Sequence, residues 1–308
     1  MRRLALIAAV ALAGCGGKRD PPGITVRAIE PGGERRAVHT ATALPGGRVL
    51  IAGGCVTDGC GTATAGTEVF APGQGFRAGP RMTTPRDGHT ATLLGGDRVL
   101  LTGGYAGEGM GALRSAEVCD PERCVRAGDL AGPLGAHAAT RLRDGTVLVT
   151  GGFDEGRALR RVERFARGRF ALAAPMRAAR EAHTATLLKD GRVLVAGGSD
   201  TAGTAVATAE LYDPRTDRWT PAGRMAEARN KHAGVALPDG RVLLVGGARD
   251  RESRTRLAST EVYDPSTNRF TAGPRLRAGR YKLPGDEVLV LGGYDGAIDI
   301  QPGAYLIG

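Results

Sequence analysis

The sequence predicts an all-β protein in which six similar four-stranded units follow one another along the chain. The first observation is a regular repeat, because Gly-Gly pairs begin at residues 53, 103, 151, 197, 246 and 292, in steps of 46 to 50 residues. The second is that each pair ends an apolar, β-branched run, such as VLVA at residues 193–196. The third is that, in the first five units, a variable loop separates the pair from two further strand-like runs, the first containing Glu.

The first two strands of each unit are expected to form a hairpin. Short turns of Gly and Asp separate these strands, and both residue types accept the positive φ angles of two-residue hairpins. The turns lie at residues 46–47, 95–96, 144–145, 190–191, 239–240 and 285–286. The strand after each turn is apolar on both faces, which is expected for a sheet packed between two neighbouring sheets.

This repeat resembles the kelch motif. The sequence HTATLLKDGRVLVAGG at residues 183–198 is similar to bacterial kelch proteins related to the galactose oxidase propeller. The resemblance covers nearly all of the chain after residue 22. It implies a six-bladed kelch-type β-propeller with four-stranded antiparallel blades over residues 23–308.

A ring of blades must be closed, because the first and last sheets would otherwise expose their edges. The sixth unit contains EVLVLGG and IQPGAYLIG, but the chain ends before a fourth strand. Residues 24–28, ITVRA, match the outer-strand sequence FRA at residues 76–78. We therefore expect an N-terminal strand to complete the sixth blade.

The N-terminus has the features of a bacterial lipoprotein signal. Residues 1–14 contain two arginines followed by an apolar run that is too short to span a membrane as a helix. The ending LAGC at residues 12–15 resembles a lipobox, which implies lipidation of Cys15 and anchoring to the bacterial cell envelope, in the outer membrane or at the cell surface. Ordinary secretory cleavage beside an incidental cysteine is the alternative. Residues 16–22, GGKRDPP, suit a flexible tether.

The basic charge does not indicate nucleic-acid binding. The formal net charge is +10 at pH 7, and nearly all basic residues are arginines scattered through every unit. An arginine preference in a GC-rich genome explains this pattern without a nucleic-acid partner, although an anionic ligand stays open.

All five histidines occupy a single repeat position, 14 residues before the first glycine of each pair. They are His39, His89, His137, His183 and His232. Repetition spreads them around a ring, so we expect hydrogen bonds within or between blades. Galactose oxidase-like chemistry would need further histidines for copper, so no metal ion, cofactor or catalytic residue is predicted.

Four cysteines remain in two pairs of the form C-x4-C. Cys55 and Cys60 lie in the first variable loop, and Cys119 and Cys124 replace the aromatic pair of the second unit. In an exported chain such close pairs favour disulfides, and a cross-strand cysteine pair can replace an aromatic contact. A zinc site is the alternative, but no spare histidine assists it.

A repeated arginine precedes the histidine by three residues in four units, at Arg36, Arg86, Arg180 and Arg229. The third unit has Leu134 instead. At the start of an inner strand these arginines could form a positive ring at the channel mouth. Alternatively, they pair with the repeated glutamates Glu68, Glu117, Glu163, Glu210 and Glu261.

The variable loops after the glycine pairs are the second candidate for a binding face. In kelch propellers these loops lie at the same end as the starts of the inner strands. They begin with Tyr105, Phe153 and Tyr294 in three units, and the fifth loop holds Arg249, Arg251, Arg254 and Arg256. Such a mouth suits a glycan, a peptide or an anionic ligand, whereas packing of the aromatic rings is the alternative.

These features favour a binding or interaction module whose partners are a membrane, through the lipid, and a protein, peptide or glycan ligand. The alternative function is a carbohydrate-active enzyme, because similar six-bladed periplasmic kelch propellers include sialic-acid mutarotases. Repeat positions account for the acid–base residues, so an enzyme is the less favoured reading. Sialidase-like hydrolysis is weaker, because the chain lacks the S-x-D-x-G-x-x-W pattern.

Overall fold

The computed structural model describes residues 36–276, except 57–60, 108 and 251–253, together with residue 279. Within this part of the chain there are five antiparallel four-stranded sheets and no α-helix. We call each sheet a blade. The predicted sixth unit and the N-terminal strand at residues 24–28 lie outside the described residues, so the structure shows five blades where the sequence predicts six.

Each blade uses four strands in sequence order, from the inner strand to the outer one. Blade 1 holds β1 (Thr40–Leu44), β2 (Arg48–Ala52), β3 (Thr67–Ala71) and β4 (Gly75–Ala78), with the 3-10 turn η1 (Pro45–Gly47) between β1 and β2. Blade 2 holds β5 (Thr90–Gly95), β6 (Arg98–Thr102), β7 (Ser115–Cys119) and β8 (Cys124–Asp129). Blade 3 holds β9 (Ala138–Arg141), β10 (Val147–Thr150), β13 (Val162–Ala166) and β14 (Arg169–Leu172), and its loop forms the short hairpin β11 (Phe153–Asp154) and β12 (Arg157–Ala158).

Blades 4 and 5 repeat the pattern most regularly. Blade 4 holds β15 (Thr184–Leu187), β16 (Val193–Ala196), β17 (Ala209–Asp213) and β18 (Arg218–Pro221). Blade 5 holds β19 (Ala233–Ala236), β20 (Val242–Val245), β21 (Thr260–Asp264) and β22 (Arg269–Ala272).

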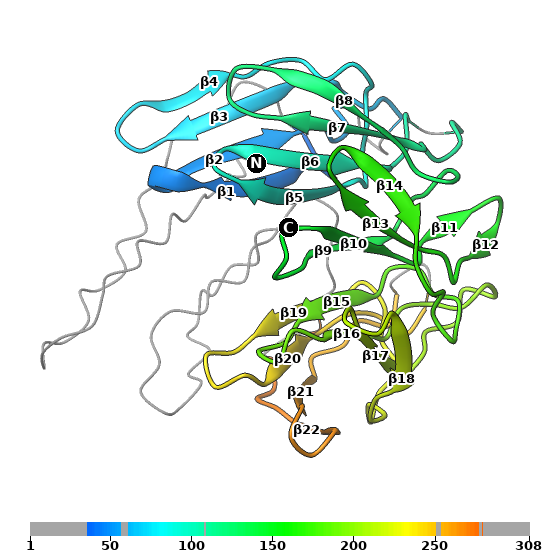
Figure 1. The fold of residues 1–308 in the computed structure, drawn as a ribbon. Helices are drawn as coiled ribbons and strands as arrows, with labels where there is room; N and C mark the ends of the chain where they lie inside the picture. Colours follow the sequence, from blue (N-terminus) through cyan, green and yellow to red (C-terminus); the bar gives the residue numbers. More distant parts are fainter. Residues whose placement is uncertain (1–35, 57–60, 108, 251–253, 277–278, 280–308) are drawn as a thin grey trace, which may run out of the picture.

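The inner strands of consecutive blades lie side by side, β1 with β5, β5 with β9, β9 with β15, and β15 with β19. Figure 1 shows the five sheets following one another around the molecule, with these strands toward its middle. The blades are therefore arranged about a central axis.

The core lies between blades. In blades 2 to 5 the apolar residues of the second strands are buried on both faces, as their continuous apolar sequence predicts. Between blades 4 and 5, for example, Leu194 and Leu211 pack with Leu244 and Tyr263. Equivalent clusters join blades 1 and 2, 2 and 3, and 3 and 4.

The glycine pair closes each junction between blades. At Gly197, φ is +62°, and an added Cβ atom would lie 2.4 Å from the carbonyl oxygen of Arg229 in the next blade. The amide of Gly198 donates a hydrogen bond to that carbonyl oxygen at 2.9 Å. Only glycine combines the left-handed conformation with so close an approach. The repeated pair is thus a contact between blades as well as a turn.

Candidate functional site

The repeated arginines lie inside the protein, between the blades. Their guanidinium groups reach the glutamate on the third strand of the same blade, at Arg36–Glu68 3.4 Å, Arg86–Glu117 2.9 Å, Arg180–Glu210 2.8 Å and Arg229–Glu261 2.8 Å. Arg86, Arg180 and Arg229 are fully buried. Burial lowers the pKa of Arg86, while Glu117 opposes that shift.

Each glutamate also fixes the segment that enters its blade. In blade 4, Glu210 accepts backbone hydrogen bonds from Arg177 at 2.7 Å and Ala178 at 3.1 Å. Arg180 in turn donates to the carbonyl oxygen of Gly197 at 2.7 Å and to that of Thr208 at 3.1 Å. A buried ion pair needs further hydrogen bonds to offset the loss of water, and here both terminal nitrogens of Arg180 donate, whereas its Nε atom has no partner among the described residues. These arginines therefore join the segment that enters each blade to the second and third strands of that blade, and they do not form the exposed positive ring considered from the sequence.

Blade 3 departs from this pattern because it keeps the glutamate, Glu163, but replaces the arginine. Leu134 occupies the arginine position, and Arg161 reaches Glu163 at 3.1 Å from a position two residues before it. Arg161 also donates to the carbonyl oxygens of Gly132 and Pro133, at 2.7 and 2.8 Å. The positive charge is thus kept, although it comes from the residue just before the third strand and not from the segment before the inner strand.

The histidines are structural in the same sense. The Nε2 atoms of His89, His137 and His232 lie 2.8 to 3.0 Å from threonine hydroxyls at the start of the preceding blade's inner strand. Blade 3 has Ala138 at that threonine position, and His183 instead contacts Thr150, which ends β10, at 2.9 Å. Burial lowers the pKa of His137 to about 3 and that of His89 and His183 well below the usual value. The rings are therefore neutral at physiological pH.

In each blade, one further antiparallel β-bridge forms beyond the glycine pair, at the end of the blade where the repeated arginines lie. It joins the residue after the glycine pair to a residue two positions before the histidine. We call these residue pairs the rim pairs. They are Ala37–Cys55, Asp87–Tyr105, Gly135–Phe153, Glu181–Ser199 and Asn230–Ala248. Their chemistry changes from blade to blade, whereas the buried Arg, His, Gly and Glu positions recur.

The first member of a rim pair faces the second member of the preceding pair. At Gly135 an added Cβ atom would lie 2.1 Å from Cζ of Tyr105, so the tyrosine ring occupies the space of a side chain there. In the same direction, Nδ2 of Asn230 donates to Oγ of Ser199 at 2.7 Å. Tyr105 and Phe153 are half-buried, which leaves part of each ring accessible.

Asp87 is a buried carboxyl group on this rim. Its residue is 8% exposed, and its side chain makes no hydrogen bond or ion pair with the residues that the structure describes. Its equivalents in blades 3 and 5, Gly135 and Asn230, face the rim residue of the preceding blade. Burial raises the pKa of Asp87 to about 6. Asp87 thus offers a hydrogen-bonding group that the fold itself does not use.

The arginines of the fifth loop are mostly near carboxylates. Arg249 pairs with Glu227, and Asp250 accepts the backbone amides of Arg254 and Thr255 at 2.8 and 2.7 Å. Arg254 and Arg256 are exposed. Arg251, like Tyr294 of the sixth unit, lies outside the described residues. The positive charge expected for this loop is therefore partly offset.

The comparisons with known proteins agree with this geometry. The Kelch motif family model matches residues 182–226 and 229–277, which span blades 4 and 5. The structure titled "Structure of YjhT" is similar with a TM-score of 0.65 and 14% sequence identity, over 78% of this chain and 84% of that chain. Among curated proteins, none matches significantly.

The fold is a kelch-type β-propeller.

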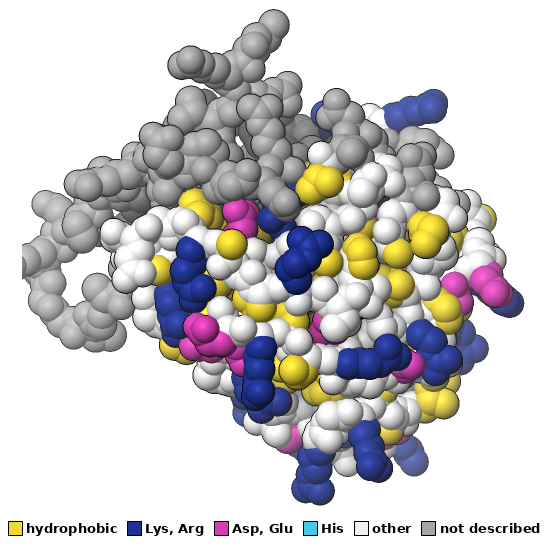
Figure 2. All heavy atoms as spheres, turned by 90° about the horizontal axis from the view of Figure 1, so that it is seen from above, with side chains coloured by type: hydrophobic (Ala, Val, Ile, Leu, Met, Phe, Trp, Pro, Cys, Tyr) yellow, Lys and Arg dark blue, Asp and Glu magenta, His cyan; other side chains and the backbone are white. Residues whose placement is uncertain are grey.

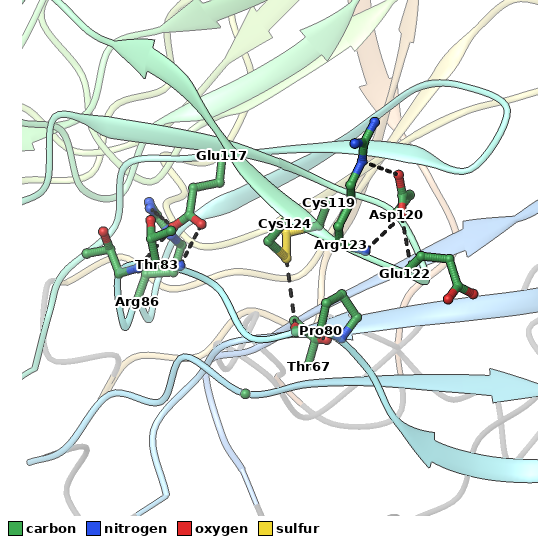
Figure 3. Close-up of a disulfide and its surroundings, with 12 residues drawn as sticks. Thr67, Pro80, Thr83, Arg86, Glu117, Cys119, Asp120, Glu122, Arg123 and Cys124 are labelled. Atoms are coloured by element: carbon green, nitrogen blue, oxygen red, sulfur yellow. Dashed lines mark hydrogen bonds and ion pairs between the residues drawn. A yellow bond between two sulfur atoms is a disulfide. The ribbon is translucent and has the colours of Figure 1, made fainter.

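One disulfide of the kelch propeller is the predicted Cys119–Cys124 bridge. It joins β7 to β8 where the other described blades place an aromatic pair, such as Tyr212–Trp219 with ring centroids 4.9 Å apart. Figure 3 shows the bridge beside Pro80 and near the buried Arg86–Glu117 pair. Cys55 is also disulfide-bonded. Its predicted partner, Cys60, lies outside the described residues.

The surface of the propeller mixes both signs of charge. Figure 2 shows the side formed by the upper sheets of Figure 1, where basic and acidic side chains alternate with apolar ones. Many exposed arginines have a carboxylate neighbour, as in Arg215–Asp213 at 2.9 Å. In the described part of the chain, no helix has the length and apolarity needed to cross a membrane.

Sequence reasoning missed Asp87, Gly135 and Arg161. Asp87 directly follows a repeated arginine, and Gly135 follows the leucine that replaces one. Both were missed because only the neighbouring arginine position forms a repeat. Such residues can be found by aligning the units and looking for positions at which the residue type changes. A position that changes from unit to unit is not needed to form the blade, so it is a candidate for binding.

Proposed function

We propose that this kelch propeller is a binding module whose ligand is a glycan held at the rim pairs. The observation that supports this most directly is the contrast between recurring and changing positions. The Arg–Glu pairs, the histidines and the glycines recur because they build each blade, whereas the rim pairs vary while occupying one shared end of the ring. Loops and rims on a rigid scaffold are where binding residues concentrate.

The chemistry of the rim suits a sugar. Tyr105 and Phe153 present half-buried rings that can cover the C–H face of a pyranose. Asp87 brings a carboxyl group that lacks a partner among the described residues, and it can accept a hydrogen bond from a sugar hydroxyl. Because the repeated arginines are neutralised inside the blades, a neutral glycan fits this rim better than a strongly anionic one.

This proposal predicts that Tyr105→Ala weakens glycan binding at least about tenfold, as expected when a stacking ring is lost. Binding is measured on a glycan array and then by calorimetry with the best ligand. Leu172→Ala is the control, because Leu172 is 70% exposed on an outer strand and should leave binding unchanged. The proposal is wrong if the wild-type protein binds no glycan, or if both variants bind equally well.

A sialic-acid mutarotase-like enzyme is the second candidate, and Asp87 is the observation that favours it. A carboxyl group with a pKa of about 6 can both donate and accept a proton near neutral pH, as opening and closing of a sugar hemiacetal requires. The same protein can be assayed for anomer interconversion by NMR. Activity that disappears in Asp87→Asn while binding persists would select the enzyme over the binding module.

We propose that the ring closes with a sixth blade built from the chain after residue 276 and from the N-terminal strand at residues 24–28. The faces of blades 1 and 5 support this. Val49 in β2 is half-buried, whereas its equivalents Val99, Val147, Val193 and Val242 are fully buried between blades. On blade 5, Val262 and Thr271 line an open cavity of about 590 Å³. Both faces would be covered by one further blade.

Removing residues 23–30 from the mature protein should therefore lower the melting temperature by several degrees, because an edge strand is lost. Removing residues 16–22 is the matched control and should have no effect, since those residues belong to the tether. Equal melting temperatures for the two truncated proteins would rule out closure by the N-terminal strand.

We propose that the protein is held on the bacterial cell envelope by lipidation of Cys15, on the basis of the LAGC sequence. Cys15→Ser should move the protein from the membrane fraction to the soluble fraction, because stable anchoring requires the acyl chains. Mass spectrometry of the N-terminal peptide checks the lipid directly. A wild-type peptide without acyl groups would contradict the proposal.

A further inference from the structure

A groove lies at the outer side of the junction between blades 2 and 3, away from the rim pairs. It has a volume of about 310 Å³. Its apolar lining comes from Val118 and Val125 of blade 2 and from Phe165 of blade 3. Its charged lining consists of Arg98, Asp120, Arg123 and Arg126, of which Arg126 pairs with Asp129. Val125 is 45% exposed. A volume of this size accommodates a small molecule.

The groove exists because blade 3 has a short outer hairpin. In blade 4, Asp217 of the turn between β17 and β18 reaches back to the amide of Ala174 at 3.0 Å, and in blade 5 Asn268 reaches the amide of Gly223 at 3.1 Å. The turn between β13 and β14 consists only of Arg167 and Gly168, both with positive φ. This two-residue turn is too short to provide a residue equivalent to Asp217 or Asn268. The outer part of the junction between blades 2 and 3 therefore stays open.

Arg98 is the cation of the groove. Its equivalents at the start of the second strand each have a carboxylate partner, in the pairs Arg48–Asp97, Arg192–Asp190 and Arg241–Asp239, with closest distances of 2.6 to 2.8 Å. In blade 2 the turn carboxylate, Asp97, is taken by Arg48 of blade 1. Arg98 is exposed, and its side chain makes no ion pair or hydrogen bond with the described residues.

The second basic residue, Arg123, is only weakly neutralised. Its Nε atom lies 3.9 Å from Asp120, and its side chain is 76% exposed. Asp120 is engaged by the turn, where one carboxylate oxygen accepts the backbone amides of Glu122 and Arg123 at 2.9 and 3.0 Å. Figure 3 shows Asp120 and Arg123 together at this turn. The groove therefore combines an apolar floor with excess positive charge.

We propose that this groove binds a molecule with an apolar body and one carboxylate group, the carboxylate being held by Arg98. A planar guanidinium matches a carboxylate in a bidentate arrangement, and the valine and phenylalanine side chains accept an aromatic or branched body. A free aromatic acid and the C-terminal residue of a peptide share this chemistry.

The probes are two pairs of molecules that differ only in charge. Phenylacetate is compared with phenylacetamide, and N-acetylphenylalanine with its amide, by NMR titration of the isotope-labelled protein. We expect each acid to bind about tenfold more tightly than its amide, with shifts at Val118, Val125 and Phe165. A preference for phenylacetate would identify free acids as the ligand class, and a preference for N-acetylphenylalanine would identify peptide C-termini.

Arg98→Gln should reduce binding of both acids about tenfold and leave the amides unchanged. Arg192→Gln is the matched control, because it changes the equivalent residue of blade 4 and should not alter binding. Since Arg98 has no partner in the described structure, its replacement should also leave the melting temperature unchanged. Acids and amides that bind equally, acids that do not bind at all, or equal effects of the two variants would each overturn the proposal.

Discussion

Glu210→Ala should destabilise the propeller by about 3 to 5 kcal/mol, which corresponds to a fall in melting temperature of about 10 °C. The reason is that the substitution leaves the positive charge of Arg180 buried without its carboxylate partner. Arg180 is fully buried, and Glu210 is its carboxylate partner at 2.8 Å. The substitution also leaves the amides of Arg177 and Ala178 without their acceptor. A buried, unpaired cation is much more costly than the loss of an exposed pair.

Asp213→Ala provides the control within the same blade. Its pair with Arg215 has a similar distance, 2.9 Å, but the arginine side chain is 74% exposed, so the expected loss of stability is much smaller. Denaturant unfolding compares the two variants. Combining Arg180→Met with Glu210→Ala should cost at least about 2 kcal/mol less than the sum of the single changes. Equal losses for Glu210→Ala and Asp213→Ala would show that the buried pair is unimportant for stability.

The sequence was sufficient to predict the blade because each of its recurring residues has a local reason. The glycine pairs, the short turns and the apolar second strands all follow from backbone geometry and burial. The Cys119–Cys124 bridge was predictable for the same reason, since it replaces an aromatic pair at a known repeat position. The hydrogen-bonding role of the histidines followed from their fivefold repetition.

The direction of the repeated arginines could not be predicted with the same certainty. A residue at the start of an inner strand can face the channel mouth or pair with the glutamate on the third strand, and the sequence left both open. The structure selects the pairing, because Glu210 lies 2.8 Å from Arg180. The exchange of Leu134 and Arg161 in blade 3 was also hidden, since the compensating residue occupies a different repeat position.

Acid should unfold the propeller more readily than the loss of surface ion pairs would suggest, because several histidines must stay neutral in the folded state. Burial, together with neighbouring arginines and histidines, lowers the pKa of His89, His137 and His183. In the unfolded chain these groups have a pKa of about 6.5. Below that pH the unfolded chain binds more protons, so their stabilising contribution is complete above pH 6.5 and is lost as the pH falls toward about 3, the pKa of His137.

Asp87 acts in the opposite direction. Its pKa of about 6 lies above the value of about 3.9 in an unfolded chain, so the folded protein binds the extra proton and gains stability as the pH falls through 6. Burial also raises the pKa of Glu163, which therefore acts in the same direction as Asp87. The three histidines outnumber these two carboxyl groups, so the free energy of unfolding should fall as the pH decreases below about 6.

Urea unfolding at pH 7.0, 6.0, 5.0 and 4.5 measures this slope. Asp87→Asn should make the slope steeper by about 1.4 kcal/mol per pH unit, because it removes the opposing group, whereas His137→Asn should make it shallower by the same amount. The two variants thus move one measured quantity in opposite directions, and neither change removes an exposed carboxylate. A stability that stays constant from pH 6.5 to 4.5, or a slope that neither variant alters, would mean that the histidines are not kept neutral by burial between the blades.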